Sequence, residues 1–500
     1  MKPRLFELPR WLWITLLFSL GYHCLTLPYS PLPWFDETYF ASMTRHFVLT
    51  GEFIPDVGPM LDYYYPQSKA YGPGYFMVTS LFYQIFGISL FWMRFPGLVF
   101  GFLFVGVCYK LLEISNVKRI WRLVYVALLL TDTIFLQNIH SARMDSMALF
   151  LAGTGFWFFI KASKDQKWLN YILAGLFFGF AMLTTPRVAV SILGVVAVSV
   201  VLFVSKPSLK ATAKYAVMGI LIPLVYSIWV YWGFGGPIQF WNYFFGPPKE
   251  QLYYENLAQG YIGNTGYVPS FQWPVLLLVV AVVFLLLILK KRRQPILFWI
   301  SAVNVVLFYK LVNDTGIYSV FCMPFAYFIV VISIDQIQIN WLKERFLPVL
   351  IGLIVSLNLG IFTIKNMAIW ITMPAKNSEL VTDQIKKIIP PGSKVIGDEV
   401  YYYSVLKSGS DFQYLNRGAS TFQRYDYHVQ EYKFQYAVIR SPNQFEKEFN
   451  YYNRNQELVE IGRIEMPKLS PMGLRLKQIL LMFHIPFSES YQGIVYQYRK

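Results

Sequence analysis

Residues 11–40 read WLWITLLFSLGYHCLTLPYSPLPWFDETYF, an apolar run followed by two adjacent acids, Asp36 and Glu37. A helix that crosses a bilayer needs about 17–25 mostly apolar residues, and the run 11–28 has this length. A cleaved signal peptide would show small residues at the exit of the run, whereas this run ends in Leu27-Pro28-Tyr29. The stretch therefore predicts an uncleaved membrane anchor that places two acids at its far end.

The composition predicts many more such spans. The 500 residues are 55% hydrophobic and 14% charged, whereas soluble domains are about a quarter charged. The net charge is +16, but the basic residues lie in short loops between apolar runs, as the positive-inside rule expects. We therefore expect membrane lipids, not nucleic acid, as their partners. The three cysteines lie inside apolar runs and the five histidines form no ligand motif, which predicts no disulfide framework.

Apolar runs of span length predict about eleven transmembrane helices. Basic loops alternate between them, which puts the N-terminus in the cytoplasm and the chain after the last span on the outer side. The predicted spans are 11–28, 92–112, 120–138, 144–162, 168–186, 188–205, 211–233, 272–290, 295–312, 317–335 and 346–368.

The segment 74–87, GYFMVTSLFYQIFG, is apolar but short for a span. If it crossed the membrane, every later basic loop would face outward. We therefore interpret it as an interfacial helix within a long first outer loop, residues 29–91. Long ordered loops of this kind usually carry function.

The tail 372–500 differs from the rest, because it holds 13 of the 28 acids and no span-length apolar run. ELVTDQIKKII has helical spacing, KVIGD, QYAVIRS and LVEIGRI are typical of strands, and 443–454 is helix-like. The predicted fold is therefore mainly α: a polytopic helical membrane domain, 1–371, with a small α/β extracytoplasmic domain, 372–500.

Ionisable residues gather on the predicted outer face, where charge at membrane depth is costly and tends to be functional. Each of these residues also has a simpler interpretation. A lone arginine can contact lipid headgroups, an Arg–x–Asp pair can be a structural ion pair, and adjacent acids can begin a helix. A helix cap explains only one of the two acids. The set is Asp36, Glu37, Lys69, Arg94, Arg143, Asp145 and Arg187, with Asp314 and Tyr318 between the ninth and tenth spans.

Acids and cations together fit transfer of a sugar from a lipid-linked phosphate. Arginine holds phosphate oxygens through its planar fork and stays charged when buried. A carboxylate can take the proton of an acceptor hydroxyl. Phosphate leaves as a weak base, so cations can stabilise it without a proton donor.

The sequence resembles the GT-C membrane glycosyltransferases, in the branch of protein O-mannosyltransferases and the aminoarabinose and galacturonic acid transferases of lipid A. The resemblance runs in order along nearly the whole chain, through WFDETYF, QSKAYGPGYF, MRFPG, SARMDSMALF, TTPRVAV, GIYSVFCMP and IIPPGSKVIGDEVYYY. It implies that Asp36 is the catalytic base and that Arg143 and Asp145 form the Arg–x–Asp of the second outer loop. The family often has lysine where this chain has Arg187, which keeps the charge.

The resemblance implies an integral membrane glycosyltransferase that transfers a monosaccharide, with inversion, from a polyprenyl phosphate to an acceptor on the outer face of a bacterial cytoplasmic membrane. Glu37 would orient the acceptor or, with Asp145, bind a divalent ion if one is used. The remaining expected substrate-binding residues are Lys69, Arg94, Arg143, Arg187 and Tyr318. The alternatives are a ligase or oligosaccharyltransferase that moves a whole lipid-linked glycan, or a lipid or sugar transporter, although we find no internal repeat of the kind transporters show.

Overall fold

The computed structural model describes residues 8–57, 71–205, 208–245, 295–311, 317–336, 347–414, 433–440, 457–482 and 490–499. Lys69 and Asp314, the predicted span 272–290 and the predicted helix 443–454 lie outside these residues.

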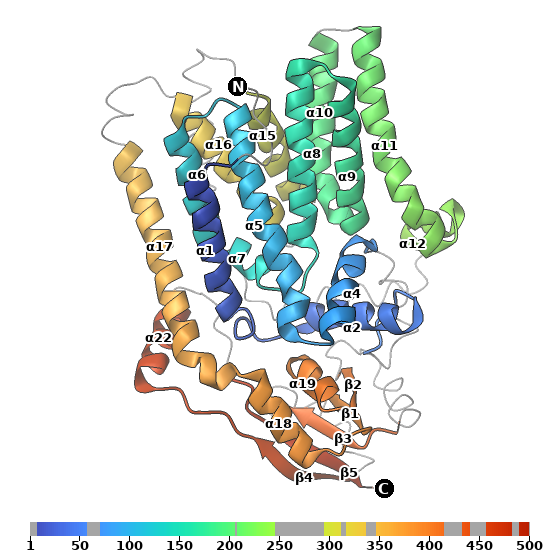
Figure 1. The fold of residues 1–500 in the computed structure, drawn as a ribbon, viewed down its shortest axis with the longest axis vertical. Helices are drawn as coiled ribbons and strands as arrows, with labels where there is room; N and C mark the ends of the chain where they lie inside the picture. The colour runs from blue at the N-terminus through green and yellow to red at the C-terminus, as the bar shows by residue number, and fades with distance from the viewer. Residues whose placement is uncertain are drawn as a thin grey trace.

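A bundle of long apolar helices makes up most of the protein (Figure 1). Ten of the eleven predicted spans coincide with helices. They are α1 (Arg10–Thr26), α5 (Leu90–Ile114), α6 (Arg119–Thr131) with α7 (Thr133–Ile139), α8 (Asp145–Asp165), α9 (Trp168–Thr184), α10 (Ala189–Ser205), α11 (Leu209–Phe234), α15 (Ile296–Leu311), α16 (Met323–Gln336) and α17 (Leu347–Thr372).

By length and apolar composition, five of the described helices can cross a membrane, or six if α6 and α7 form one span. The chain is therefore an integral membrane protein, while the count of eleven stays a prediction. The predicted span 120–138 is divided into two helices, because the chain bends by 64° between α6 and α7. The cause is Asp132, whose Oδ1 accepts hydrogen bonds from the Ile134 and Phe135 amides at 3.0 and 2.7 Å and so starts a new helix.

The first loop contains two helices that lie across one end of the bundle (Figure 1). They are α2 (Phe35–Thr50) and α4 (Gly74–Phe86), and the second occupies the segment predicted as an interfacial helix. The two pack together, with the hydroxyls of Thr44 and Thr79 in contact at 2.9 Å. A shorter helix, α12 (Pro237–Phe245), follows α11 near the same end.

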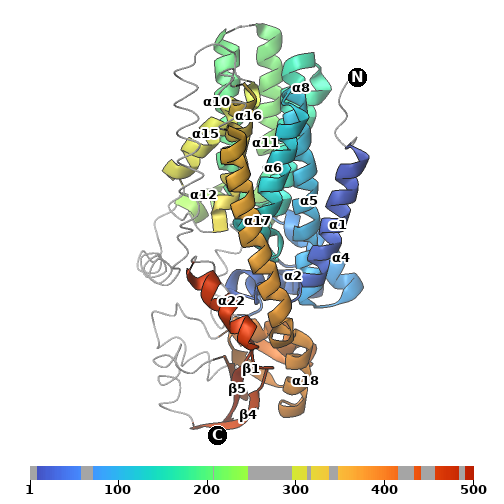
Figure 2. The same ribbon diagram turned by 90° about the vertical axis from the view of Figure 1, so that its left-hand side faces the viewer.

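The tail forms a five-stranded sheet beyond α2 and α4, at the opposite end of the molecule from the N-terminus (Figures 1 and 2). The strand order is β2-β1-β3-β5-β4. β1 pairs in parallel with β2 and β3, whereas β5 pairs antiparallel with β3 and β4. The tail elements are α18 (Ser378–Ile388), β1 (Lys394–Gly397), α19 (Tyr402–Lys407), β2 (Asp411–Tyr414), β3 (Tyr436–Ile439), β4 (Glu457–Ile464), α22 (Pro471–Met482) and β5 (Gly493–Arg499). The strands predicted at 394–398, 435–441 and 458–464 are confirmed, and the division at 371/372 stays a prediction.

The tail and the first loop share one apolar core, in which Phe40 and Tyr75 of the loop pack with Tyr401 and Tyr491 of the tail. Polar contacts support this packing. The Gln413 side-chain amide donates to the Asp56 carbonyl at 2.9 Å. The tail is therefore seated directly on the loop that carries the two acids.

Candidate active site

The predicted outer-face residues come together where α2 begins. The cap position of α2 is Trp34, which makes no side-chain capping bond, so Asp36 is not the cap of this helix. The loop between α7 and α8 lies against α5 because Gly97 permits close contact: a Cβ there would be 2.9 Å from the Ser141 carbonyl oxygen. This approach brings Arg143, which follows on the same loop, to the start of α2.

Arg143 is the centre of the site, and its side chain is only 1% exposed. Its Nε donates to Asp145 Oδ2 at 2.7 Å, and its Nη1 pairs with Asp36 Oδ2. Burial opposes charge on the guanidinium, but the Asp145 and Asp36 carboxylates raise the pKa of Arg143 above its usual range. The guanidinium is therefore a fixed positive charge held between two acids.

Aromatic rings enclose this guanidinium. Its Cζ lies 5.3, 5.8 and 5.2 Å from the ring centroids of Trp34, Phe40 and Tyr318. Such rings attract a cation and exclude water. The exclusion of water strengthens any charge interaction made inside this aromatic box, which Trp34, Phe40 and Tyr318 form.

Arg187 approaches the same ring of Tyr318 from another element. It lies on the short 3-10 turn Pro186–Val188 between α9 and α10, with its Cζ 4.0 Å from the Tyr318 ring centroid. Its Nη2 donates to the Tyr71 hydroxyl at 3.1 Å. The two guanidiniums thus share one tyrosine.

Each of these two arginines keeps one nitrogen without a partner. Arg143 Nη2 and Arg187 Nη1 are buried and make no hydrogen bond within the described part of the chain. Unsatisfied buried donors on charged groups are costly, so the site is complete only with an acceptor. A phosphate group has the charge and the oxygens to fill it.

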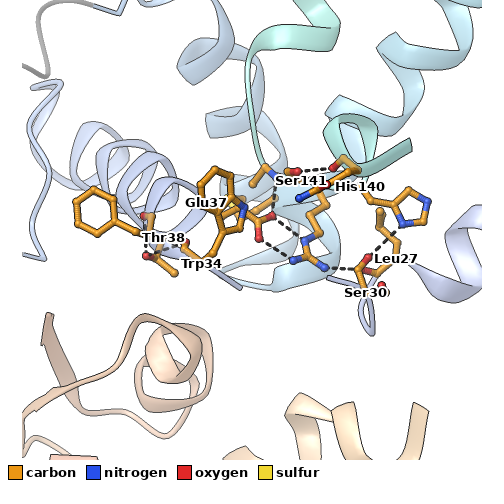
Figure 3. Close-up of polar contacts among 12 residues, drawn as sticks. Leu27, Ser30, Trp34, Glu37, Thr38, His140 and Ser141 are labelled. Atoms are coloured by element: carbon orange, nitrogen blue, oxygen red, sulfur yellow. Dashed lines mark hydrogen bonds and ion pairs between the residues drawn. The ribbon is translucent and has the colours of Figure 1, made fainter. Parts of the chain in front are cut away.

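Asp36 is the more accessible acid of the pair in WFDETYF, with a side chain 16% exposed. Glu37 has no exposure and forms a closed pair with Arg94, also unexposed (Figure 3). Arg94 Nε and Nη2 donate to the two Glu37 oxygens at 2.8 and 2.7 Å, and Arg94 Nη1 donates to the Leu27 carbonyl at 2.7 Å. The Ala142 amide donates to Glu37 Oε1 at 2.8 Å.

This closed pair ties four segments together: the end of α1, the start of α2, the helix α5 and the loop before α8. The sequence predicted that Arg94 binds phosphate and that Glu37 meets the acceptor or a metal. The geometry favours neither role, because each group is saturated by the other and sealed from solvent. It favours a positioning role for both.

A divalent ion does not fit the acids as they are arranged. Asp36 and Asp145 are both paired with the Arg143 guanidinium, and Glu37 is occupied by Arg94. In the part of the chain that the structure describes, no three His, Cys, Asp or Glu side chains gather in a way that could hold a metal ion. We therefore derive no step through a metal.

The sequence did not predict three features of the site. Trp34 and Tyr71 were quoted inside motifs without a role. The histidines form no ligand motif in the sequence, yet His140 Nε2 and His23 Nδ1 lie 2.7 Å apart. His140 Nδ1 lies 3.1 Å from the Ser30 carbonyl oxygen (Figure 3). The signal for Tyr71 was its place in AYGPGY, next to a glycine whose Cβ would clash with the Leu183 carbonyl oxygen.

One family and several solved structures are similar to this chain. Residues 69–232 match the family described as dolichyl-phosphate-mannose-protein mannosyltransferase. No curated protein matches the chain significantly.

Among solved structures, the chain is similar to ArnT from Cupriavidus metallidurans in the apo state, with 14% identity, coverage of 97% of both chains and a TM-score of 0.58. It is also similar to the same protein bound to undecaprenyl phosphate, with 13% identity, coverage of 97% of both chains and a TM-score of 0.56. Identity this low shows a shared fold. The family match over 69–232 and the shared fold of the whole chain confirm the resemblance to the GT-C membrane glycosyltransferases.

Proposed function

We propose that this protein transfers a monosaccharide from a polyprenyl-phosphate donor to an acceptor, with inversion and with Asp36 as the general base. One observation carries the proposal: two buried arginines, Arg143 and Arg187, each keep a nitrogen unpartnered beside the same tyrosine, next to a partly exposed carboxylate. This is a site for an anion with a base at its rim.

The comparisons support the chemical class of the donor. The matched family is described by a dolichyl-phosphate sugar, and one similar structure is bound to undecaprenyl phosphate. Both are polyprenyl phosphates, so the anion that we place at Arg143 and Arg187 is the phosphate of such a lipid.

In the proposed step, Asp36 removes the proton of the acceptor hydroxyl. The acceptor oxygen then forms a bond to the anomeric carbon, and the bond from that carbon to the phosphate oxygen breaks with its electron pair on the phosphate. Attack on the face opposite the leaving group inverts the anomeric centre. Arg143 and Arg187 stabilise the charge that develops on the leaving phosphate.

The resting contact between Asp36 and Arg143 suggests an order for these events. In the resting site, one oxygen of the Asp36 carboxylate is already held by the Arg143 guanidinium. A donor phosphate that takes contacts from Arg143 competes with Asp36 for the same guanidinium. Donor binding therefore frees the base, and the acceptor is deprotonated only when a donor is in place.

The other site residues take supporting roles in this proposal. Asp145 is buried and fixes the plane of the Arg143 guanidinium through its contact with Nε. The Tyr318 ring contacts both guanidiniums, and its attraction for each cation offsets part of their mutual repulsion. Glu37 and Arg94 hold the segment before α2, and with it the position of Asp36.

The placement of the site supports the predicted topology. The helix α2 and the tail lie at the end of the bundle away from the N-terminus (Figure 1), and Asp36 near the start of α2 pairs with Arg143. With the N-terminus in the cytoplasm, this end faces outward, and in a bacterium the membrane would be the cytoplasmic one. The acceptor is then a lipid, glycan or protein outside that membrane.

The test begins with mass spectrometry of glycans and glycolipids from a deletion strain and its parent, which identifies the sugar and the acceptor. Turnover is then measured with purified protein and a radiolabelled donor, together with the release of polyprenyl phosphate. Asp36→Asn should lower turnover by roughly 100-fold or more, as loss of a general base predicts, while expression stays parental. Glu379→Gln, which changes an exposed acid paired with Lys407 in the tail, is the matched control. Parental turnover by Asp36→Asn would remove Asp36 from the mechanism, and transport of intact substrate without release of polyprenyl phosphate would refute the transferase.

A further inference from the structure

The helix α22 of the tail lies beside the transmembrane helix α17 and not on the sheet (Figures 1 and 2). Leu476 and Ile479 of α22 pack with a stripe of α17 that runs from Ile361 to Ile371. Near the start of α22, a Cβ at Gly473 would be 3.2 Å from the Ile371 side chain. These contacts follow α17 over ten residues, or about 15 Å of helix.

We expect this stripe to lie where α17 passes from the hydrocarbon core of the membrane into the headgroup region. The sequence before α17 is NWLKER, which marks its cytoplasmic end. A hydrocarbon core of about 30 Å takes about 20 residues, so from Leu347 it ends near residue 367. Trp370 is 45% exposed just beyond this point, as expected of an aromatic side chain at the membrane interface.

Several large apolar side chains of α22 are exposed. Met472, Leu474, Leu481 and Met482 are 53, 50, 51 and 70% exposed. Four large apolar side chains on one short helix are unusual for a surface in water. The neighbouring helix α17 is itself only 22% buried inside the protein over its apolar window.

The charges of α22 have one sign. The helix carries Arg475 and Lys477 and no acid, although the tail as a whole is the acid-rich part of the chain. An amphipathic helix with basic and large apolar side chains lies in the headgroup region of a membrane, and its basic groups face anionic lipids.

We propose that α22 is inserted in the leaflet nearest the candidate site, with Leu474 and Leu481 among the acyl chains and Arg475 at the headgroups. The occupant of the exposed face is membrane lipid. The tail is therefore held on the membrane at two places, by α17 and by α22. This second anchor adds to the apolar core that the sheet already shares with the first loop.

The test places one nitroxide label at a time in the full-length protein in lipid nanodiscs, after replacement of the three cysteines. Leu481 is the test position, Leu357 on the lipid-exposed side of α17 is the membrane reference, and exposed Lys407 of the tail is the water reference. Collisions with oxygen report the bilayer and collisions with a water-soluble nickel chelate report solvent. Because Leu481 is already exposed, the label does not disturb packing.

We expect the label at 481 to match the Leu357 reference, with high access to oxygen and low access to nickel. A match to the Lys407 reference would place α22 in water and overturn the proposal. Low access to both reagents would mean that protein covers the face, and dipolar broadening between labels would identify that protein as a second copy. Either of these outcomes would also overturn it. None depends on the activity of the enzyme, so this test is independent of the proposed function.

Discussion

The closed pair of Glu37 and Arg94 gives the sharpest test of how the site is built. We predict that Glu37→Gln destabilises the protein, because it leaves the Arg94 guanidinium buried without a counter-ion. Both side chains have 0% exposure, and the carboxylate accepts three hydrogen bonds of 2.7 to 2.8 Å. A catalytic residue would behave differently, since its removal would lower turnover and leave stability unchanged.

The magnitude follows from these contacts. Removal of one partner of a buried pair costs about 3–5 kcal/mol. The double variant Glu37→Gln/Arg94→Met removes the stranded charge as well. The new amide oxygen can still accept from the Ala142 amide, and the new NH2 group lacks an acceptor in the single and the double variant alike. The double variant differs by the Leu27 carbonyl, which loses its donor at a cost of about 1–3 kcal/mol. The double variant should therefore be more stable than the single variant Glu37→Gln.

The assay is a double-mutant cycle on the free energy of unfolding, measured by detergent denaturation in mixed micelles. Glu379→Gln is again the matched control, since its partner Lys407 is 43% exposed and Glu379 itself 62% exposed; its cost should stay below about 1 kcal/mol. The positioning role would be refuted if the costs in the cycle were additive. It would also be refuted if Glu37→Gln kept parental stability and had strongly reduced turnover, since Glu37 would then take part in the reaction.

Three further predictions concern donor binding and topology. Arg143→Ala should weaken donor binding by roughly 10- to 150-fold, as loss of a charge-assisted contact predicts. Arg143→Lys should recover only part of the donor affinity, because lysine lacks the planar fork. Parental donor affinity in both variants would show that Arg143 has only a structural role. Gly72→Ala should also weaken donor binding. A Cβ there would lie 1.8 Å from the Leu183 carbonyl oxygen and would displace the loop that leads to Arg187. Unchanged donor affinity would contradict this prediction. A cysteine at Lys407 should react with a membrane-impermeant reagent in intact cells, and reaction only after the membrane is opened would reverse the topology.

The sequence was sufficient for the bundle and for most residues of the site. Apolar runs predict helices almost without reference to neighbours, because a bilayer leaves the backbone few alternatives. The sharing of one face by Asp36, Arg143 and Arg187 followed from counting basic loops. Their order along the chain gave the resemblance to the glycosyltransferases.

The sequence could not distinguish the roles of Asp36 and Glu37. The two acids are neighbours, but consecutive helical residues point in different directions. Asp36 pairs with Arg143 and stays partly exposed, whereas Glu37 pairs with Arg94 and is fully buried. Nor did the sequence reveal the pairing of Arg94, whose partner lies 57 positions away. The break at Asp132 was missed because hydropathy averages over a window and does not register a single capping acid.

The charge arrangement around Arg143 explains why a base and two arginines belong in one site. Before the donor binds, two cations face two carboxylates. In the proposed reaction a phosphodiester with one negative charge becomes a phosphate monoester, which gains a second. Asp36 loses its negative charge in the same step, because it takes the acceptor proton. The net charge inside the aromatic box therefore stays constant from donor complex to product. Charge separation is most costly in such a low-dielectric enclosure, so Asp36 must stand beside Arg143 for its protonation to offset the charge gained by the phosphate. This requirement places the acid at the mouth of the first helix, where a donor in the membrane and an acceptor from outside can both reach it.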